Sequence, residues 1–521
     1  MTHHPAKEYD VIVVGGGPAG ATVSTFIAMR GHKVLLLERS TVPRYQIGES
    51  LLPATINGIC VLLGVHEELQ AAGFEKKFGG AFRWGRDPEP WFFNFRGVEG
   101  SDRPANAYQV ERSKFDHILL MNARKKGVEV RTECSAHEAI EENGRVVGLS
   151  FTDEKGAFAS ARARFVVDAS GNAGKFSALV GQRVYSEFFK NFALFGYYEN
   201  GKRLPEPRSG HILSAAFDEG WFWYIPLSKT LTSVGAVFQA PPDSRKPIEG
   251  NLEEAMAAFI ARCPIISDFL KDAKRVTEGT YGQLRVRKDW SYACDKFWRN
   301  GLALIGDSAC FVDPLLSQGV HLATYSGLLA ARSINSCLDG VTEESDAFAE
   351  FEARYRREYG LFYQYLTSLY DMNSDQQSFF WRARSLLNTP ERGNDAFVRL
   401  LAGEAPGDPA VSSAQRFFDA RLGAGDQLEG MMNPTYAARS PRAGDAAAAP
   451  HAVQDFAGMQ ALIPQLDSEG KRIQIAARSG GQSPQERPIR DNGLVTTPDG
   501  LGWMKHTEPA PQPADQAAAV L

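Results

Sequence analysis

The run of residues 9–20, YDVIVVGGGPAG, restricts the fold more than any other part of the chain. Residues 10–14 predict a short buried strand, because β-branched side chains dominate them. Gly15, Gly17 and Gly20 follow and give the pattern G-x-G-x-x-G at the turn from strand to helix. Such glycines allow a tight turn, a close approach of backbone to a pyrophosphate, and close packing of helix on strand.

The residues after the glycines complete this unit. Pro18 and Ala19 fall in the first turn of the expected helix, whose free N–H groups suit a diphosphate. Residues 34–38 form a second apolar run that ends at Glu38, where an acid can bind an adenosine ribose. A glycine-rich turn without a ligand is the alternative, but this order of strand, glycines, helix, strand and acid indicates a bound dinucleotide.

The composition of the 521 residues excludes several classes of protein. The formal net charge is −5, so there is no basic surplus for nucleic acid or an anionic membrane surface. Six scattered cysteines form no C-x-x-C pair and no zinc-ligand spacing, which predicts reduced thiols, no metal site and a cytoplasmic location. The polar start predicts no signal peptide, and no apolar run is long enough to predict a membrane span.

The pattern along the chain predicts an α/β fold, with a Rossmann-like nucleotide-binding domain, an aromatic-rich mixed β-sheet as substrate domain, and a helical C-terminal region. The expected division is a core at 1–340 with the substrate sheet interleaved at about 76–110 and 185–285, a helical region at 341–425 covering the active site, and a mostly loop or disordered tail at 426–521. An aromatic stripe at helical spacing within 345–371 predicts a docking face. In the tail, 493–503 is the exception, because Pro-Asp-Gly marks a turn there.

Shorter patterns predict the individual elements. Strands are expected at 78–84, 128–131, 145–151, 157–163, 165–171, 211–217, 221–226, 231–238 and 301–305, and helices at 51–63, 108–126, 252–261, from about 317, and up to about 422. The three strands between 211 and 238 are rich in aromatic residues, and we expect them to cross over a binding pocket.

Three segments in a fixed order point to one kind of dinucleotide enzyme. The glycine loop, the turn at 168–171 and the pair Gly306-Asp307 before Pro314 together resemble the flavoprotein monooxygenase superfamily with the p-hydroxybenzoate hydroxylase fold. The resemblance implies that FAD is held at both ends, by the glycine loop at the ADP half and by Asp307 at the ribityl chain. The implied FAD-binding residues are Gly15, Gly17, Ala19, Gly20, Glu38, Arg39, Arg44, Glu49, Ser50, Arg112, Asp168, Asp289, Asp307, Pro314 and Gly319.

One branch of that superfamily fits better than the others. Residues 220–226, GWFWYIP, match G-W-x-W-x-I-P, the motif of flavin-dependent halogenases. The segments GESL at 48–51, KFGGAF at 77–82 and DPLLSQG at 313–319 extend this resemblance over about residues 8–420. The chain looks most similar to halogenases of phenols or pyrroles, often carried on a thiolation domain. It is less similar to halogenases of free tryptophan, which have an acid at the position of Leu316.

The resemblance implies a reaction in two compartments. Reduced FAD and O₂ give a C4a-hydroperoxide, chloride attacks it, and hypohalous acid passes through a tunnel to Lys77, which presents the halogen to an electron-rich aromatic ring. Trp221 and Trp223 are expected to separate the ring from the flavin. The halide is expected at the backbone N–H groups of Gln318 and Gly319, because a small anion needs only amides and a helix dipole. Glutamine at this place is bulkier than the small hydroxyl residue that is usual in the family.

Lys77 has two interpretations. It can belong to a solvated charge run at 75–77, or it can hold the halogen by a hydrogen bond or as a chloramine. The pattern K-x-G-x-x-F at the start of a strand favours the catalytic interpretation. Burial and the charge of Lys76 would then shift Lys77 toward its neutral, nucleophilic form. Lys76 is the weaker candidate, since neighbours on a strand face opposite ways.

The single dinucleotide pattern also predicts the partners. We expect no stable NAD(P)H site, and therefore a separate NAD(P)H-dependent flavin reductase, together with an acyl or peptidyl carrier protein that bears the substrate. Alternative functions are an FAD-dependent aromatic hydroxylase that uses NAD(P)H directly, an FAD-dependent isoprenoid reductase, and a degenerate flavin-binding scaffold that delivers a carrier protein. Asp289 is expected near the flavin edge, and covalent attachment of the flavin stays open.

Overall fold

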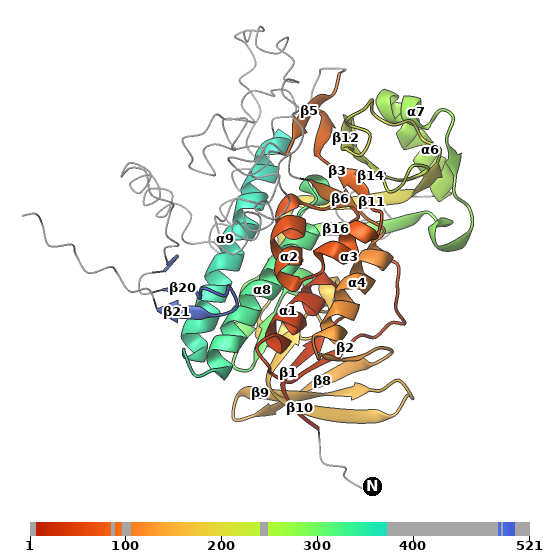
Figure 1. The fold of residues 1–521 in the computed structure, drawn as a ribbon. Helices are drawn as coiled ribbons and strands as arrows, with labels where there is room; N and C mark the ends of the chain where they lie inside the picture. The colour runs from red at the N-terminus through yellow and green to blue at the C-terminus, as the bar shows by residue number, and fades with distance from the viewer. Residues whose placement is uncertain are drawn as a thin grey trace, which may run out of the picture.

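The computed structural model describes residues 7–84, 89–95, 106–239, 248, 250–371, 488–490 and 493–505. Two large β-sheets and a set of long helices make up most of this part of the chain (Figure 1). A short hairpin from near the C-terminus lies against the two longest helices (Figure 1).

The first sheet contains the strand that leads into the glycine loop. Its order is β17-β18-β10-β1-β2-β7, and the hairpin of β8 and β9 joins it at β10. These strands are β1 (Lys7–Val14), β2 (Val34–Leu37), β7 (Glu129–Arg131), β8 (Ser135–Glu142), β9 (Arg145–Thr152), β10 (Phe158–Asp168), β17 (Trp298–Arg299) and β18 (Leu302–Leu304). Strands β2, β1, β10 and β18 are parallel, so their carboxyl ends meet at one edge, where open α/β sheets bind ligands.

The helices pack on the two sheets and on one another. They are α1 (Pro18–Ala28), α2 (Cys60–Leu63), α3 (His66–Ala71), α4 (Arg112–Lys125), α5 (Ser177–Val180), α6 (Leu252–Arg262), α7 (Pro264–Leu270), α8 (Gly319–Leu338) and α9 (Glu344–Asp371). A Cβ on Gly327 of α8 would lie 2.9 Å from the carbonyl oxygen of Ala19 in α1. The glycine therefore lets these two helices approach closely, which fixes both helix N-termini beside the glycine loop.

The second sheet is antiparallel apart from one parallel pair and is rich in aromatic residues. Its order is β19-β16-β11-β14-β13-β12-β4-β5, with β15 beside β11. These strands are β4 (Gly79–Arg83), β5 (Trp91–Asn94), β11 (Arg183–Glu199), β12 (Ile212–Phe217), β13 (Gly220–Pro226), β14 (Leu231–Gln239), β15 (Lys274–Arg275), β16 (Arg285–Cys294) and β19 (Cys310–Phe311). One face joins the main core, and the other packs under α6 and α7. A separate pair, β3 (Glu75–Lys77) and β6 (Ala107–Gln109), holds Lys77.

The α/β fold class is confirmed, and most predicted elements occur with small shifts in their ends. Three predictions need correction. The expected helix at 108–126 begins only at Arg112, because Ala107–Gln109 pairs as a strand with β3. The expected helix at 51–63 contains a π-helical segment, Ala54–Ile59, before α2. The two strands expected at 157–163 and 165–171 are the single strand β10, which pairs with β9 and then continues between β1 and β18.

The aromatic stripe of α9 is a docking face, as predicted, since all six of its rings are buried. They are Phe348, Phe351, Tyr355, Tyr359, Phe362 and Tyr363. The helix expected up to about residue 422 and the boundary near 425 lie outside the described residues. Within the tail, the turn expected at 493–503 joins β20 (Leu494–Thr496) to β21 (Trp503–Lys505).

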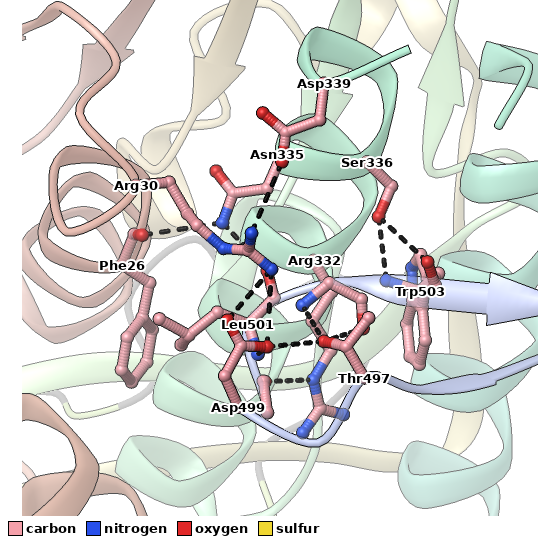
Figure 2. Close-up of polar contacts among 12 residues, drawn as sticks. Phe26, Arg30, Arg332, Asn335, Ser336, Asp339, Thr497, Asp499, Leu501 and Trp503 are labelled. Atoms are coloured by element: carbon pink, nitrogen blue, oxygen red, sulfur yellow. Dashed lines mark hydrogen bonds and ion pairs between the residues drawn. The ribbon is translucent and has the colours of Figure 1, made fainter. Parts of the chain in front are cut away.

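The C-terminal hairpin is attached to the core through its turn and through Trp503 (Figure 2). Trp503 is fully buried, donates its indole N–H to the Ser333 hydroxyl at 2.8 Å, and packs against the guanidinium groups of Arg332 and Arg354. Arg332 and Asn335 donate to carbonyl oxygens of the turn, each at 2.8 Å. Buried aromatic area and these hydrogen bonds together hold the hairpin on α8 and α9.

Trp503→Ala is expected to lower the free energy of unfolding by about 3–5 kcal/mol, because it removes a large buried ring that packs against two guanidinium groups. Hydrogen exchange should report the loss as faster exchange of the amides at 494–505. Met504→Ala is the matched control, since that side chain is 40% exposed. Equal protection of the hairpin in Trp503→Ala and wild type would contradict this role.

No helix in the described segments is long and apolar enough to cross a membrane. Across the same segments, no group of three or more His, Cys, Asp or Glu side chains is arranged to hold a metal ion.

Candidate active site

A cavity of about 740 Å³ lies where the carboxyl ends of the first sheet face the second sheet, a size typical of cofactor sites. The predicted residues that line it are Gly15, Gly17, Ala19, Glu38, Arg39, Arg44, Glu49, Ser50, Arg112, Trp221, Trp223, Asp289, Asp307, Pro314 and Gly319. The predicted residues Gly20, Lys77, Asp168 and Gln318 do not line it. The structure thus brings thirteen of the fifteen predicted cofactor residues to the wall of one cavity and places Gly20 and Asp168 elsewhere.

The three glycines of the loop have different tasks. Gly15 has φ +109°, and a Cβ there would lie 2.4 Å from the carbonyl oxygen of Ala169. A Cβ on Gly20 would lie 1.9 Å from the carbonyl oxygen of Gly15, so these two glycines are needed by the fold itself. Gly17 has an extended backbone, and the nearest atom to its Cβ position is Nη2 of Arg44 at 3.4 Å. Gly17 is therefore the glycine that leaves room for a ligand.

Glu38 lies beside this loop at the end of β2. Its carboxylate accepts the N–H of Gly16 at 2.8 Å and the N–H of Ser40 at 2.9 Å, and Nη2 of Arg44 is 3.5 Å away. A carboxylate has about four acceptor positions, so one side remains available to a ribose. Arg39, the next residue, is exposed at the cavity wall.

The loop at 44–50 is held in place by Arg112 of α4. The Arg112 guanidinium donates to the carbonyl oxygen of Ile47 at 2.7 Å and to the Asp116 carboxylate at 2.8 and 3.0 Å. Because these bonds use most of its donors, Arg112 positions the loop as well as lining the cavity. Glu49 and Ser50 reach the cavity from this loop.

Two carboxyl groups lie at another part of the wall. Burial raises the pKa of Asp307 to about 6, against the lowering charges of Arg112, Arg287 and Arg183. Burial, followed by the charge of Asp313, raises the pKa of Asp289 well above its usual range. Oδ2 of Asp289 has no hydrogen-bond partner among the described residues. Both carboxyl groups are thus placed to meet polar groups of a ligand.

Asp168 has a structural role instead. Its Oδ1 accepts the N–H and the hydroxyl of Ser170 at 3.0 and 2.6 Å and the hydroxyl of Ser308 at 3.1 Å. Its Oδ2 accepts the N–H of Phe176 at 2.6 Å. The carboxylate is fully buried and its acceptor positions are taken, so it fixes the turn after β10, and residues 169–173 line the cavity in its place.

The N-terminus of α8 opens into the cavity. Pro314, Ser317 and Gly319 line it, and no atom lies within 4 Å of a Cβ built on Gly319. The bulky Gln318 side chain points away: it is fully buried and its amide donates to the carbonyl oxygens of Val312 and Asp313. Gln318 therefore supports the loop and leaves the helix N-terminus free of its side chain.

The two tryptophans of β13 form an aromatic wall of the cavity. Trp221, Trp223 and Ile225 share one face because strand neighbours alternate, and all three line the cavity. The Trp221 indole donates to the Tyr370 hydroxyl at 2.5 Å, and the Trp223 indole donates to the Ser233 hydroxyl at 3.2 Å. Both rings are buried and fixed by these bonds.

Lys77 is separated from the cavity and buried. Its side chain is 2% exposed, and its Nζ donates to the carbonyl oxygen of Leu51 at 3.0 Å. Burial lowers the pKa of Lys77 to about 7. Lys76 is exposed, which agrees with opposite orientation of strand neighbours. At neutral pH about half of the Lys77 amines are therefore unprotonated, and buried groups with such shifted pKa values are typical of active sites.

Sequence reasoning missed a second buried base near Lys77. His211 is 2% exposed, and neither ring nitrogen has a hydrogen-bond partner in the described part of the chain. Burial, together with the charges of Arg208 and Lys77, lowers the pKa of His211 to about 3. No motif marks His211, because it comes close to Lys77 only through the pairing of β12 with β4. Other cavity residues that carried no motif are Tyr45, Gln46, Ile47, residues 134–137, Ala193, Phe195, Ile212, Arg287 and Lys288.

A parallel sheet with this glycine loop, closed by an aromatic second sheet, defines the class of nucleotide-cofactor oxidoreductases. Comparison with known proteins then gives the family. The sequence profile of the tryptophan halogenase family matches residues 10–104 and 98–421, and the chain belongs to this family. It is a flavin-dependent halogenase, and such enzymes use reduced FAD, O₂ and a halide.

Three relatives show the range of the similarity. The tryptophan 2-halogenase of Chondromyces crocatus is 34% identical over 379 residues, which are 72% of this chain and 70% of the relative. The 1H-pyrrole-2-carbonyl-[peptidyl-carrier protein] chlorinase of Pseudomonas fluorescens is 29% identical over 390 residues, 70% of this chain and 84% of the relative. The structure of the myxobacterial chondrochloren halogenase CndH is 48% identical with a TM-score of 0.72, covering 95% of this chain and all of that one.

Proposed function

We propose that this halogenase chlorinates an electron-rich aromatic ring, phenolic or carrier-protein-tethered, in a natural-product pathway. The observation that carries the proposal is the position of Lys77. Its amine is buried, its pKa is lowered to about 7 by burial, and it does not line the cavity that the tryptophans border. Hypohalous acid can then form in the cavity, and the aromatic substrate can be halogenated at Lys77, outside it.

The cavity residues fit FAD. Gly17 and Gly319 both leave open space at the wall, the N-termini of α1 and α8 supply free N–H groups, and Glu38 keeps acceptor positions. The thirteen predicted FAD-binding residues at the wall, which exclude the two tryptophans, remain our proposed FAD contacts. When bound and reduced, FAD supplies the electrons with which O₂ and halide give hypohalous acid.

The halide site is proposed at the backbone N–H groups of Gln318 and Gly319. Chloride is the proposed halide, since the N-terminus of a 20-residue helix favours a small anion and the Gln318 side chain is turned away from it. Trp221 and Trp223 exclude the aromatic substrate from the cavity and so prevent its direct hydroxylation. Lys77 holds the halogen by an ammonium hydrogen bond or as a chloramine formed by its neutral amine.

The residue at position 316 bears on the substrate class. Leu316 stands where halogenases of free tryptophan have an acid, and its side chain is buried and apolar. This favours a phenol or a pyrrole, although one relative is named for tryptophan and another for a carrier-bound pyrrole. Product formation that requires chloride and an added NAD(P)H-dependent flavin reductase, followed by mass spectrometry of phenols and carrier-bound pyrroles, tests the proposal. Product formed without halide would contradict it.

NADPH alone is expected to leave the bound flavin oxidised, because the chain has one dinucleotide pattern and it serves FAD. Stopped-flow absorbance at the flavin band after mixing with NADPH checks this. A flavin reductase with NADPH in the same cell is the positive control. Rapid bleaching by NADPH, stimulated by an aromatic compound, would favour the aromatic hydroxylase.

A further inference from the structure

Three side chains form a hydrogen-bonded row at the cavity wall, and the reaction described above uses none of their hydroxyl or carboxyl protons. The Tyr197 hydroxyl donates to Oε1 of Glu49 at 2.7 Å, and its oxygen is 2.8 Å from the Tyr45 hydroxyl. Because Tyr197 gives its one proton to Glu49, Tyr45 is the donor in the second bond. Both hydroxyl protons therefore point along the row toward Glu49.

The row runs along the cavity wall from a partly exposed residue to a buried one. Glu49 is 2% exposed and lines the cavity, and two residues later the Leu51 carbonyl accepts a hydrogen bond from Nζ of Lys77. At the other end, Tyr45 also lines the cavity but is only half-buried, and its ring centroid lies 4.1 Å from the guanidinium carbon of Arg285. Solvent therefore has more access to Tyr45 than to Glu49.

The proposed reaction needs a proton in this interior. Balanced for an aromatic ring ArH, it reads FADH₂ + O₂ + ArH + Cl⁻ + H⁺ → FAD + ArCl + 2 H₂O. One C–H bond is replaced by one C–Cl bond, O₂ takes four electrons, and one proton is taken from solvent in each turnover. The buried part of the cavity wall, where Glu49 lies, therefore has to receive one proton in each turnover.

We propose that Tyr45, Tyr197 and Glu49 form a proton path along the cavity wall, from the partly exposed Tyr45 to the buried Glu49, which supplies the proton that each chlorination consumes. In one transfer, Tyr197 gives its proton to the Glu49 carboxylate, takes the proton of Tyr45, and Tyr45 takes one from water. Each hydroxyl loses one O–H bond and gains one, and Glu49 then releases its proton into the cavity. The inference rests on the proposed function, which requires this proton.

The charges around the path suit this role. Burial raises the pKa of Glu49 to about 7, while the Ser233 and Tyr197 hydroxyls and the charge of Arg112 lower it, and Glu111 raises it. Glu49 is thus mainly protonated below pH 7 and mainly ionised above it. Burial raises the pKa of both tyrosines, Arg285 and Arg287 opposing this for Tyr45, so both remain neutral phenols, as a relay requires.

Tyr197→Phe tests the path, because it keeps the ring and removes the central hydroxyl. We expect kcat for chlorination to fall about tenfold at pH 8, with a larger solvent isotope effect and FAD affinity unchanged within about twofold. Tyr281→Phe is the matched control: its ring centroid lies 4.3 Å from that of Tyr197, but its hydroxyl donates to Glu111 and stands outside the row. A Tyr197→Phe enzyme with the wild-type pH profile and isotope effect would overturn the proposal.

Infrared spectroscopy of the flavin-free protein gives a readout independent of halogenation. A protonated-carboxyl band that titrates near pH 7 should be present in wild type, absent in Glu49→Gln and shifted in Tyr197→Phe. Absence of this band from wild type at pH 6 would overturn the path whatever the reaction. If wild type makes no halogenated product, the proposed function fails, and the infrared result alone decides whether Glu49 exchanges protons through Tyr197.

Discussion

Lys77→Ala is expected to abolish halogenated product while the protein still folds, binds FAD and consumes O₂. The reason is spatial: Nζ of Lys77 is bonded to the Leu51 carbonyl and lies outside the cavity, so its loss removes the group that presents the halogen and leaves the cofactor site intact. We expect a fall in product of at least about 100-fold, the usual range for loss of one group that acts on the reacting atoms. Mass spectrometry measures the loss of halogenated product, and a trapping reagent measures the hypohalous acid that is released.

Two further substitutions distinguish the contribution of the Lys77 amine from the contributions of its charge and of its side-chain volume. Lys77→Met keeps most of the buried stem and should be as inactive as Lys77→Ala. Lys77→Arg should not restore activity, because a guanidinium stays charged and cannot form a chloramine. Lys76→Ala is the control, since Lys76 is exposed on the same strand. Halogenation by Lys77→Ala at a near wild-type rate would show that the residue has no part in the chemistry.

Gly17→Val is expected to weaken FAD binding by at least about 100-fold, or about 3 kcal/mol, without unfolding the protein. The backbone of Gly17 has φ −77° and ψ −175°, which valine adopts readily, and only Nη2 of Arg44 lies near the Cβ position. The added side chain therefore fills the space where backbone must approach the pyrophosphate. Calorimetric titration with FAD and a thermal melt of the flavin-free protein measure the two effects separately.

Gly15→Val is the contrasting variant. Its Cβ would overlap the carbonyl oxygen of Ala169, and the residue has φ +109°, so this variant should fail to fold as well as to bind. The sequence pattern assigns three tasks to these glycines, namely a tight turn, a close approach to a pyrophosphate and close helix packing, and among Gly15, Gly17 and Gly20 only Gly17 has room at its Cβ position for a ligand to approach. If Gly17→Val binds FAD with wild-type affinity, the assignment of the glycine loop to the cofactor site is wrong.

Most of the fold was predictable, because its signals are local. The glycine loop, the apolar run that ends at Glu38 and the alternating aromatic strands depend on residues within ten or twenty positions of one another. The Pro-Asp-Gly turn before Trp503 was visible for the same reason. Errors arose where pairing with a distant strand overrode local preference, as at Ala107–Gln109, which joins β3 and shortens the helix that follows.

The sequence by itself determined the class of enzyme and the cofactor loop, and it singled out the tryptophan pair and Lys77 as candidate site residues, since each belongs to a short motif. Only the tertiary structure decided which of these groups share a cavity and which lie behind it. Asp168 occupies its motif position, but its carboxylate accepts hydrogen bonds within the turn after β10. The side-chain amide of Gln318 donates to a carbonyl oxygen of its own loop. The row from Tyr45 to Glu49 through Tyr197 joins residues 152 positions apart, and hydrogen bonds over such distances along the chain leave no periodic signal in a single sequence.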